Sequence, residues 1–308
     1  MTTGFFSHDD CSKHVMGPEH PECPERLSAI ISYLADTGLD QTLDWVKPEE
    51  ITRDQLLLAH PEGYLHQLDL MQPTRGRVYT DPDTAMMPLT LRAARLAAGA
   101  NVQAVDMVLS NQLTNAFVCA RPPGHHAERS KSMGFCFYNN VALAAKRALN
   151  FHHLERVAII DFDVHQGNGT VDIVGGDERI LMCSSFQHPF YPHSHVHRQA
   201  SNIINTPISA GESALTYRKT VEEAWLKRLQ DFRPQMILIS AGFDGHSLDP
   251  MAELNLEVED YRWLTEMLAS VARDHANDRI ISTLEGGYHL KALAESVNAH
   301  LEVLSQIH

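Results

Sequence analysis

The chain has 308 residues, of which 44% are hydrophobic and 21% are charged, as is usual for a globular protein with a substantial core. Its formal net charge of −14 argues against a nucleic-acid binder, because contacts with phosphates require clustered lysines and arginines. An acidic surface remains compatible with cationic substrates.

The cysteines and the first residues predict a cytoplasmic protein. The five cysteines are scattered and form no C-x-x-C pair, so we expect reduced thiols. The first ten residues, MTTGFFSHDD, lack the basic and apolar regions of a signal peptide. No apolar run reaches the length needed to cross a bilayer, so we expect no membrane partner. A homo-oligomer is compatible with the sequence, which identifies no interface.

Helices and buried strands alternate along the chain. Pro24 and Gly38 suit the two ends of a first helix, since proline favours the first turn and glycine the residue after the last turn. Further helical stretches are predicted over residues 88–109, 140–149, 214–229, 258–276 and 290–304. The short strands between them are almost continuously apolar, as in strands buried on both faces. This alternation predicts an α/β fold, with a central, mainly parallel sheet flanked by helices, in a single domain spanning residues 1–308.

Four of the strands run directly into polar clusters. FVCA precedes RPPGHH, VAIID precedes FDVHQGNG, MILIS precedes AGFDG, and IISTL precedes EGGYH. In open α/β sheets, ligands bind outside the carboxyl ends of the strands. If these four strands are neighbours in one sheet, the clusters meet at one rim and form a mononuclear metal hydrolase site.

The second cluster has candidate metal-site residues at alternate positions, Asp161, Asp163 and His165. In an extended segment these side chains point to one side, so Asp163 and His165 can reach one cation while Asp161 orients a neighbour. Asp244 in the AGFDG cluster offers a third ligand. Two carboxylates and one imidazole leave an open coordination position, as catalytic Zn²⁺ requires, and the same set suits Fe²⁺ or Co²⁺.

His125 and His126 follow a rigid Pro-Pro-Gly turn and are candidates for proton transfer. An unperturbed imidazole titrates near neutral pH, which suits a general base. Asp161 and Asn168 are candidates to bind the far ring nitrogens. An aspartate partner favours imidazolium and an asparagine partner the neutral ring, so the two histidines can have distinct roles.

Tyr288 belongs to the fourth cluster and follows Gly286 and Gly287. The two glycines allow close backbone packing or a positive φ, and we expect Gly287 to border the substrate. The phenol can donate a hydrogen bond to the oxyanion of a tetrahedral intermediate. Loss of one such donor typically costs about 10² to 10³ in rate.

The four motifs, in this order over nearly the whole chain, resemble those of the zinc-dependent histone deacetylases. HPECPERL near the N-terminus also resembles a motif of that family. The resemblance is closest to the class II-like deacetylases, which include bacterial histone deacetylase-like amidohydrolases, because Asn168 stands where class I members carry an aspartate. It implies the arginase–deacetylase fold and hydrolysis of an Nε-acyl-lysine amide in a peptide or protein.

The resemblance also implies roles for the polar residues. Asp163, His165 and Asp244 would bind one catalytic Zn²⁺. His126 would serve as general base and then as general acid, with His125 as its electrostatic partner.

A substrate channel is implied in the same way. Tyr288 would polarise the acyl carbonyl together with the metal. Gly134 and Phe135 would line the channel, with the glycine carbonyl accepting the substrate amide N–H. Tyr191 would face Phe135, and Arg26 would sit near the inner acetate pocket.

A structural K⁺ is a further implication. Its ligands would be main-chain oxygens of Asp161, Asp163 and His165, together with Ser184 and Ser185. The chain departs from the family pattern at SSFQ (184–187), where S-L-H is usual, and at the His-rich run 188–197, which replaces a glycine-rich segment. We expect no second physiological metal in that run, and it leaves the substrate preference at the rim open.

Three alternatives remain. A binuclear manganese ureohydrolase of the arginase type would need further carboxylates where Gly167 and Gly242 stand. Acetylpolyamine amidohydrolases of the family carry a glutamate seven residues after the third ligand, where this chain has the apolar Met251, although Asp249 and Glu253 lie close to it in sequence. A non-catalytic acyl-lysine binder would usually lack the tyrosine, a metal ligand or a histidine, all of which are present.

Overall fold

The computed structural model describes residues 2–196 and 200–307. Within these ranges, eight strands form one parallel sheet in the order β2-β1-β5-β10-β9-β6-β7-β8. The strands are β1 (Thr3–Phe6), β2 (Leu43–Val46), β5 (Asn115–Val118), β6 (Val157–Asp161), β7 (Ile180–Gln187), β8 (Ile203–Ile208), β9 (Met236–Ala241) and β10 (Ile280–Leu284). A separate antiparallel hairpin consists of β3 (Val78–Asp81) and β4 (Thr84–Met86).

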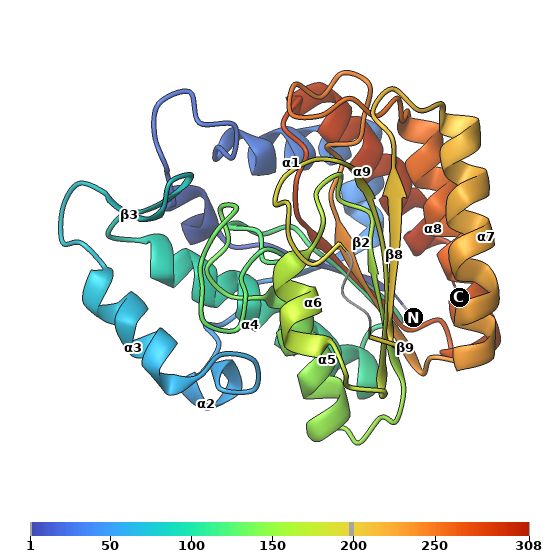
Figure 1. Cartoon of the computed structure of the whole chain (residues 1–308), viewed down its shortest axis with the longest axis horizontal. Helices are drawn as coiled ribbons and strands as arrows, with labels where there is room; N and C mark the ends of the chain where they lie inside the picture. The colour runs from blue at the N-terminus through green and yellow to red at the C-terminus, as the bar shows by residue number, and fades with distance from the viewer. Residues whose placement is uncertain (1, 197–199, 308) are drawn as a thin grey trace.

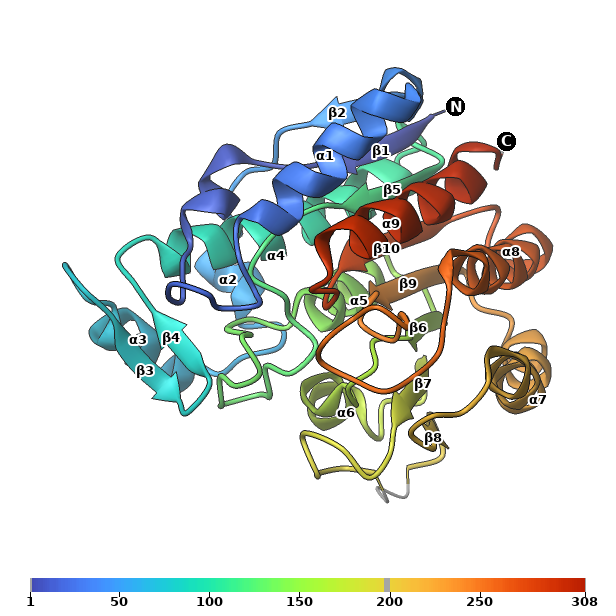
Figure 2. The ribbon, with the colours of Figure 1, turned by 90° about the horizontal axis from the view of Figure 1, so that it is seen from above.

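Helices cover both faces of the sheet (Figure 1). They are α1 (Glu25–Thr37), α2 (Arg53–Leu56), α3 (Glu62–Met71), α4 (Thr90–Leu109), α5 (Asn140–Asn150), α6 (Asn168–Val174), α7 (Ala214–Phe232), α8 (Val258–His275) and α9 (Leu290–Ser305). The layer α1-α9-α8-α7 lies on one face, and α4, α5 and α6 lie on the other (Figure 2). The α/β fold predicted from the sequence is therefore confirmed.

The six predicted helical stretches correspond to α1, α4, α5, α7, α8 and α9. Gly38 ends α1 as expected: its φ is 77°, and its N–H donates to the carbonyl of Ala35. The prediction missed α2, α3, α6 and the β3–β4 hairpin. No helix in the described ranges has the length and hydropathy needed to span a lipid bilayer.

The order of the strands in space differs from their order in the chain. The last two strands in sequence, β9 and β10, insert between β5 and β6. All four are buried along their whole length, which their apolar side chains favour. Because the sheet is parallel, all four carboxyl ends lie at the same rim.

Candidate active site

The four polar clusters meet at the rim formed by β5, β10, β9 and β6. The register pairs Asp161, the last residue of β6, with Ser240 of β9 and with Ser184 of β7. The predicted convergence is confirmed, and it follows from the insertion of β9 and β10 at the centre of the sheet.

The extended conformation expected for residues 161–165 is wrong. β6 ends at Asp161, and the residues after it form a loop. Backbone N–H groups of this loop donate to carboxylates: Asp163 N–H to Asp161 (3.2 Å), His165 N–H to Asp163 (2.9 Å), and Val164 N–H to Asp244 (2.9 Å). Asp163 and His165 therefore converge because the loop turns around the carboxylates, and not because of strand alternation.

Asp163, His165 and Asp244 form a compact, buried group. Their ligand atoms all lie within 4.8 Å of one another. Nδ1 of His165 is 3.0 Å from a carboxylate oxygen of Asp163 and 3.1 Å from one of Asp244. Among the described residues, no other group of three or more histidine, cysteine or acidic side chains meets this criterion. The three residues thus offer two oxygens and one nitrogen to a single cation.

Glycines leave room for these carboxylates. A Cβ at Gly242 would collide with the carboxylate of Asp163, and one at Gly286 would collide with those of Asp244 and Asp163. A Cβ at Gly167 would collide with Asp161. Side chains that could hold a second ion therefore do not fit at Gly167 or Gly242, which argues against the binuclear alternative.

Asp163 and Asp244 are buried close together, so the charge of one affects the pKa of the other. Burial and the adjacent charge of Asp163 raise the pKa of Asp244 to about 7. Burial opposes ionisation of Asp163 too, but the nearby His125 and His165 rings keep its pKa below the usual range. Two buried carboxylates this close are stabilised by a bound cation, which fits the donor set.

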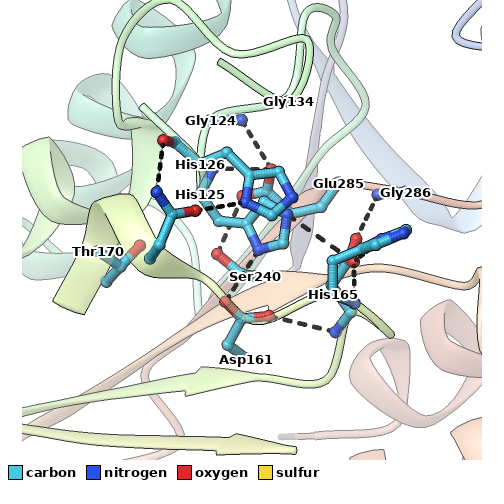
Figure 3. Close-up of polar contacts among 12 residues, drawn as sticks. Gly124, His125, His126, Gly134, Asp161, His165, Thr170, Ser240, Glu285 and Gly286 are labelled. Carbon is cyan, nitrogen blue, oxygen red and sulfur yellow. Dashed lines mark hydrogen bonds and ion pairs between the residues drawn. The ribbon is translucent and has the colours of Figure 1, made fainter. Parts of the chain in front are cut away.

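His125 and His126 have different partners, as predicted. Nδ1 of His125 lies 3.0 Å from Asp161, toward which its ring points (Figure 3), and Nδ1 of His126 lies 2.7 Å from the side-chain oxygen of Asn168. Burial disfavours a charged His125, but Asp163 and Asp161 outweigh it and raise the pKa of His125 well above the usual value. Burial and the charge of His125 lower the pKa of His126 well below it. The partners therefore favour the charged form of His125 and the neutral form of His126.

Glu285 is a site residue that the sequence did not single out. It is fully buried, and its carboxylate accepts hydrogen bonds from the backbone N–H groups of Gly124 (2.7 Å) and His125 (3.2 Å) and from Ser240 Oγ (2.9 Å), as Figure 3 shows. Burial raises its pKa to about 7. Glu285 thus ties the histidine turn to β9 and β10. The sequence feature that could have identified Glu285 is its position as an acidic residue directly after a buried strand.

A cavity of about 250 Å³ opens onto His125, His126 and His165, the last of which belongs to the candidate metal-ligand group of Asp163, His165 and Asp244. It is lined by His125, His126, His165 and Tyr288, by the predicted channel residues Gly134, Phe135, Tyr191 and Met251, and also by Asp83, Pro123, Phe190 and Gly286. The structure thus brings the predicted channel residues together. Asp83 and Phe190 were missed: Asp83 reaches the site from the unpredicted hairpin, and Phe190 stacks on His165 with ring centroids 5.2 Å apart.

Two predicted substrate residues, Arg26 and Gly287, are absent from the described lining of this cavity. Arg26 is fully buried and donates to the carbonyls of Gly287 (2.6 Å) and Glu285 (2.5 Å). Its guanidinium lies 5.1 Å from the ring centroid of Tyr288. Gly287 has a φ of 116°, which glycine adopts readily. Both residues therefore shape the backbone behind Tyr288.

The predicted potassium ligands lie beside the metal-ligand loop. Ser184 and Ser185 belong to β7, and Ser184 is the register partner of Asp161. The buried Oγ of Ser184 has no hydrogen-bond partner among the described residues, which suits a cation ligand. Oγ of Ser185 lies 2.8 Å from the Tyr217 hydroxyl.

The described part of the His-rich run forms a loop at the rim. Nε2 of His195 lies 3.5 Å from a carboxylate oxygen of Glu128. His197, the last residue of the run, lies outside the described residues.

Comparisons with known proteins agree with this geometry. Residues 20–304 match the model of the histone deacetylase domain. The histone deacetylase-like amidohydrolase of Pseudomonas aeruginosa is 32% identical, over 93% of this chain and 81% of its own. The polyamine deacetylase HDAC10 of Mus musculus is 33% identical, over 99% of this chain and 48% of its own. The crystal structure of the HDA15 HD domain superposes with a TM-score of 0.92 at 30% identity, covering 98% of this chain and 89% of that one. The chain therefore belongs to the histone deacetylase family and is a deacetylase that hydrolyses amides.

Proposed function

We propose that this enzyme is a zinc-dependent deacylase that hydrolyses Nε-acyl-lysine in peptides or proteins. One observation carries the proposal: two histidines with unlike partners, a tyrosine and His165 line one cavity, and Asp163 and Asp244 lie directly against His165. Each part of a metal-assisted amide hydrolysis is thus represented by a side chain in contact range of the same space.

Asp163, His165 and Asp244 would hold the Zn²⁺. Two carboxylates and one imidazole match a catalytic zinc site with an open position, although Fe²⁺ is also compatible with these donors. Zinc bound there would polarise the acyl carbonyl and lower the pKa of water towards neutrality. For K⁺, we propose the site at Asp161, Ser184 and Ser185, supported by the unpartnered Ser184 hydroxyl.

The two histidines would divide the proton transfers. His126, kept neutral by burial and by the charge on His125, would take the proton of the attacking water and pass it to the leaving amine. His125, held as imidazolium by Asp161, would stabilise the negative charge that develops in the transition state. Asn168 would keep the ring of His126 in place.

Tyr288 would donate its phenolic hydrogen bond to the oxyanion. Burial and the negative charge of Asp244 raise the pKa of Tyr288 well above its usual value, so the phenol keeps its proton. Its ring is 6.2 Å from that of Phe135 and nearly perpendicular to it, at 87°, which fixes the wall of the cavity.

A narrow cavity with aromatic walls suits a linear acyl-lysine side chain. Phe135 and Tyr191 would flank the methylenes, and the carbonyl of Gly134 would accept the amide N–H. Met251 at the cavity would contribute apolar contact only. We therefore favour a lysine side chain over a polyamine.

A second candidate is the deacetylation of acetylpolyamines. Two observations favour it: the relative from Mus musculus is a polyamine deacetylase, and Asp83 places a carboxylate in the cavity lining. Oδ1 of Asp83, however, lies 3.2 Å from the backbone nitrogen of Gly134, so this carboxylate already has an internal partner.

The deciding experiment compares two substrates on the same metal-loaded protein. The protein is stripped with a chelator, reloaded with one equivalent of Zn²⁺, and assayed with an acetyl-lysine peptide and with N-acetylated spermidine and putrescine. Restored turnover of the peptide alone is expected. Turnover of the polyamines alone would overturn the substrate, and inactivity on all three with one zinc bound would overturn the acetyl-lysine assignment.

A further inference from the structure

Glu128 is connected to the ring of His126 through a single side-chain amide. Its Oε1 accepts a hydrogen bond from Nδ2 of Asn168 over 2.7 Å. The side-chain oxygen of the same Asn168 lies 2.7 Å from Nδ1 of His126. Glu128 lies two residues after the RPPGHH cluster and has no part in the chemistry proposed for the site.

The charge of Glu128 favours one orientation of the Asn168 amide. In that orientation the NH₂ end lies 2.7 Å from Glu128, closer than to its two weaker acceptors, Sδ of Met133 (3.3 Å) and the carbonyl of His126 (3.5 Å). An amide has a donor end and an acceptor end, and a rotation of 180° exchanges them. An ionised carboxylate can only accept, so Glu128 requires the NH₂ end of Asn168. Asn168 is completely buried, so solvent water cannot compensate the opposite orientation, in which two acceptor oxygens would face each other.

The amide orientation in turn determines the tautomer of His126. With the Asn168 oxygen at Nδ1, the neutral ring carries its proton on Nδ1 and keeps a lone pair on Nε2. His126 lines the cavity, so this lone pair is available to the attacking water there. The reversed amide would favour a proton on Nε2 and would remove the base.

We propose that Glu128 is a positioning residue that orients the Asn168 amide and thereby sets the tautomer of His126. The inference rests on the proposed role of His126 as general base. The proposal also connects the His-rich loop to the site, because Nε2 of His195 lies 3.5 Å from the same carboxylate oxygen of Glu128. The side chains of Glu128 and His195 are 24% and 26% exposed, so the base is supported from the rim of the cavity.

The first test replaces the hydrogen-bond acceptor at position 128 with a donor. In Glu128→Lys, the new ammonium group donates, so the Asn168 oxygen turns towards it and the NH₂ end faces His126. We expect kcat to fall by at least about 10², the lower range for general-base catalysis, with little change in KM. Adding Asn168→Asp supplies a carboxylate that accepts from both sides, so the double variant should regain at least about tenfold in kcat over Glu128→Lys.

Three controls separate this effect from loss of structure or of charge. Zinc content and Tm are measured for every variant. Glu223→Lys, at a side chain on α7 that is 70% exposed, makes the same change in net charge and should keep wild-type kcat. A Glu128→Lys variant with wild-type kcat, or a double variant no faster than Glu128→Lys, would overturn the proposal.

The second test reads the tautomer directly and needs no substrate, so it stands even if the substrate assignment fails. In zinc-loaded protein with ¹⁵N-labelled histidine, NMR should show His126 as the Nδ1–H tautomer. Glu128→Gln keeps the size of the side chain but can accept or donate, so both tautomers should appear. A ring that stays entirely Nδ1–H in Glu128→Gln would contradict the proposal even if Glu128→Lys fails to fold.

Discussion

Asp249 holds the backbone at Tyr288 to the loop that carries Met251. One oxygen of its carboxylate accepts from the backbone N–H groups of Tyr288 (2.6 Å) and His289 (3.2 Å). The other accepts from the N–H of Met251 over 3.0 Å. The side chain is buried, with an exposed fraction of 6%. These contacts join the backbone at Tyr288 to the loop of Met251, and we expect Asp249→Asn to loosen both sides of the cavity.

The size of the effect follows from the three hydrogen bonds. An asparagine oxygen turned towards Tyr288 and His289 keeps two of them and places its NH₂ against the N–H of Met251. One bond to a charged acceptor is then lost, which costs about 1.5–3 kcal/mol of unfolding free energy. For a chain of this length that lowers Tm by about 2–5 °C. The remaining bonds weaken because the acceptor is now neutral.

Activity should fall more than stability suggests. A displacement of a catalytic group by about 1 Å can cost about 10² in rate, so we expect kcat/KM to drop by about 10 to 10², mainly in kcat. The assay is deacetylation of the acetyl-lysine peptide by zinc-loaded protein, with Tm measured on the same samples. Asp231→Asn, at a 63% exposed side chain, is the matched control. Unchanged Tm and unchanged kcat/KM in Asp249→Asn would refute the reasoning.

Further predictions concern the tyrosine, the metal ligands and two buried histidines. Tyr288→Phe should retain zinc and lower kcat by about 10² to 10³, and an unchanged kcat would remove the phenol from the mechanism. Asp244→Asn should weaken zinc retention, measured as metal content after dialysis, and full occupancy with full activity would argue against a ligand role. Burial lowers the pKa of His60 to about 4 and that of His300 to about 3, so both contribute stability that is fully present above about pH 6.5. As pH falls below 6.5, each should remove up to about 1.4 kcal/mol per pH unit down to its folded pKa. The urea midpoint of metal-free His300→Gln should therefore rise relative to that of the metal-free wild type as pH falls from 7.5 to 5, and a difference that stays constant would contradict this.

The main elements could be predicted because their local signals are strong. Long helical patterns located α1, α4, α5 and the three C-terminal helices, and Pro24 and Gly38 marked the ends of the first. The short elements were missed for a physical reason. α2 has four residues and α6 has seven, and segments this short are stable only through tertiary contacts and caps.

The candidate site, too, has features that the sequence predicted and features that it did not. The chemistry of Asp163, His165, Asp244 and the two adjacent histidines could be read from residue types and spacing. The hydrogen-bond partners of these residues could not be predicted from the sequence. For example, the Glu285 carboxylate accepts from the backbone N–H groups of Gly124 and His125, which lie 161 and 160 positions away in the chain. Local patterns carry no information about such contacts.

By itself, then, the sequence determined the fold class, the four strand ends and the residues able to bind a metal or move a proton. Tertiary structure alone decided that β9 and β10 insert between β5 and β6, which brings those residues together. It also decided that Arg26 braces the backbone behind Tyr288 and that Glu128 reaches His126 through Asn168. The physical reason is that these contacts arise from long-range packing, whereas composition and periodicity report only what each segment favours alone.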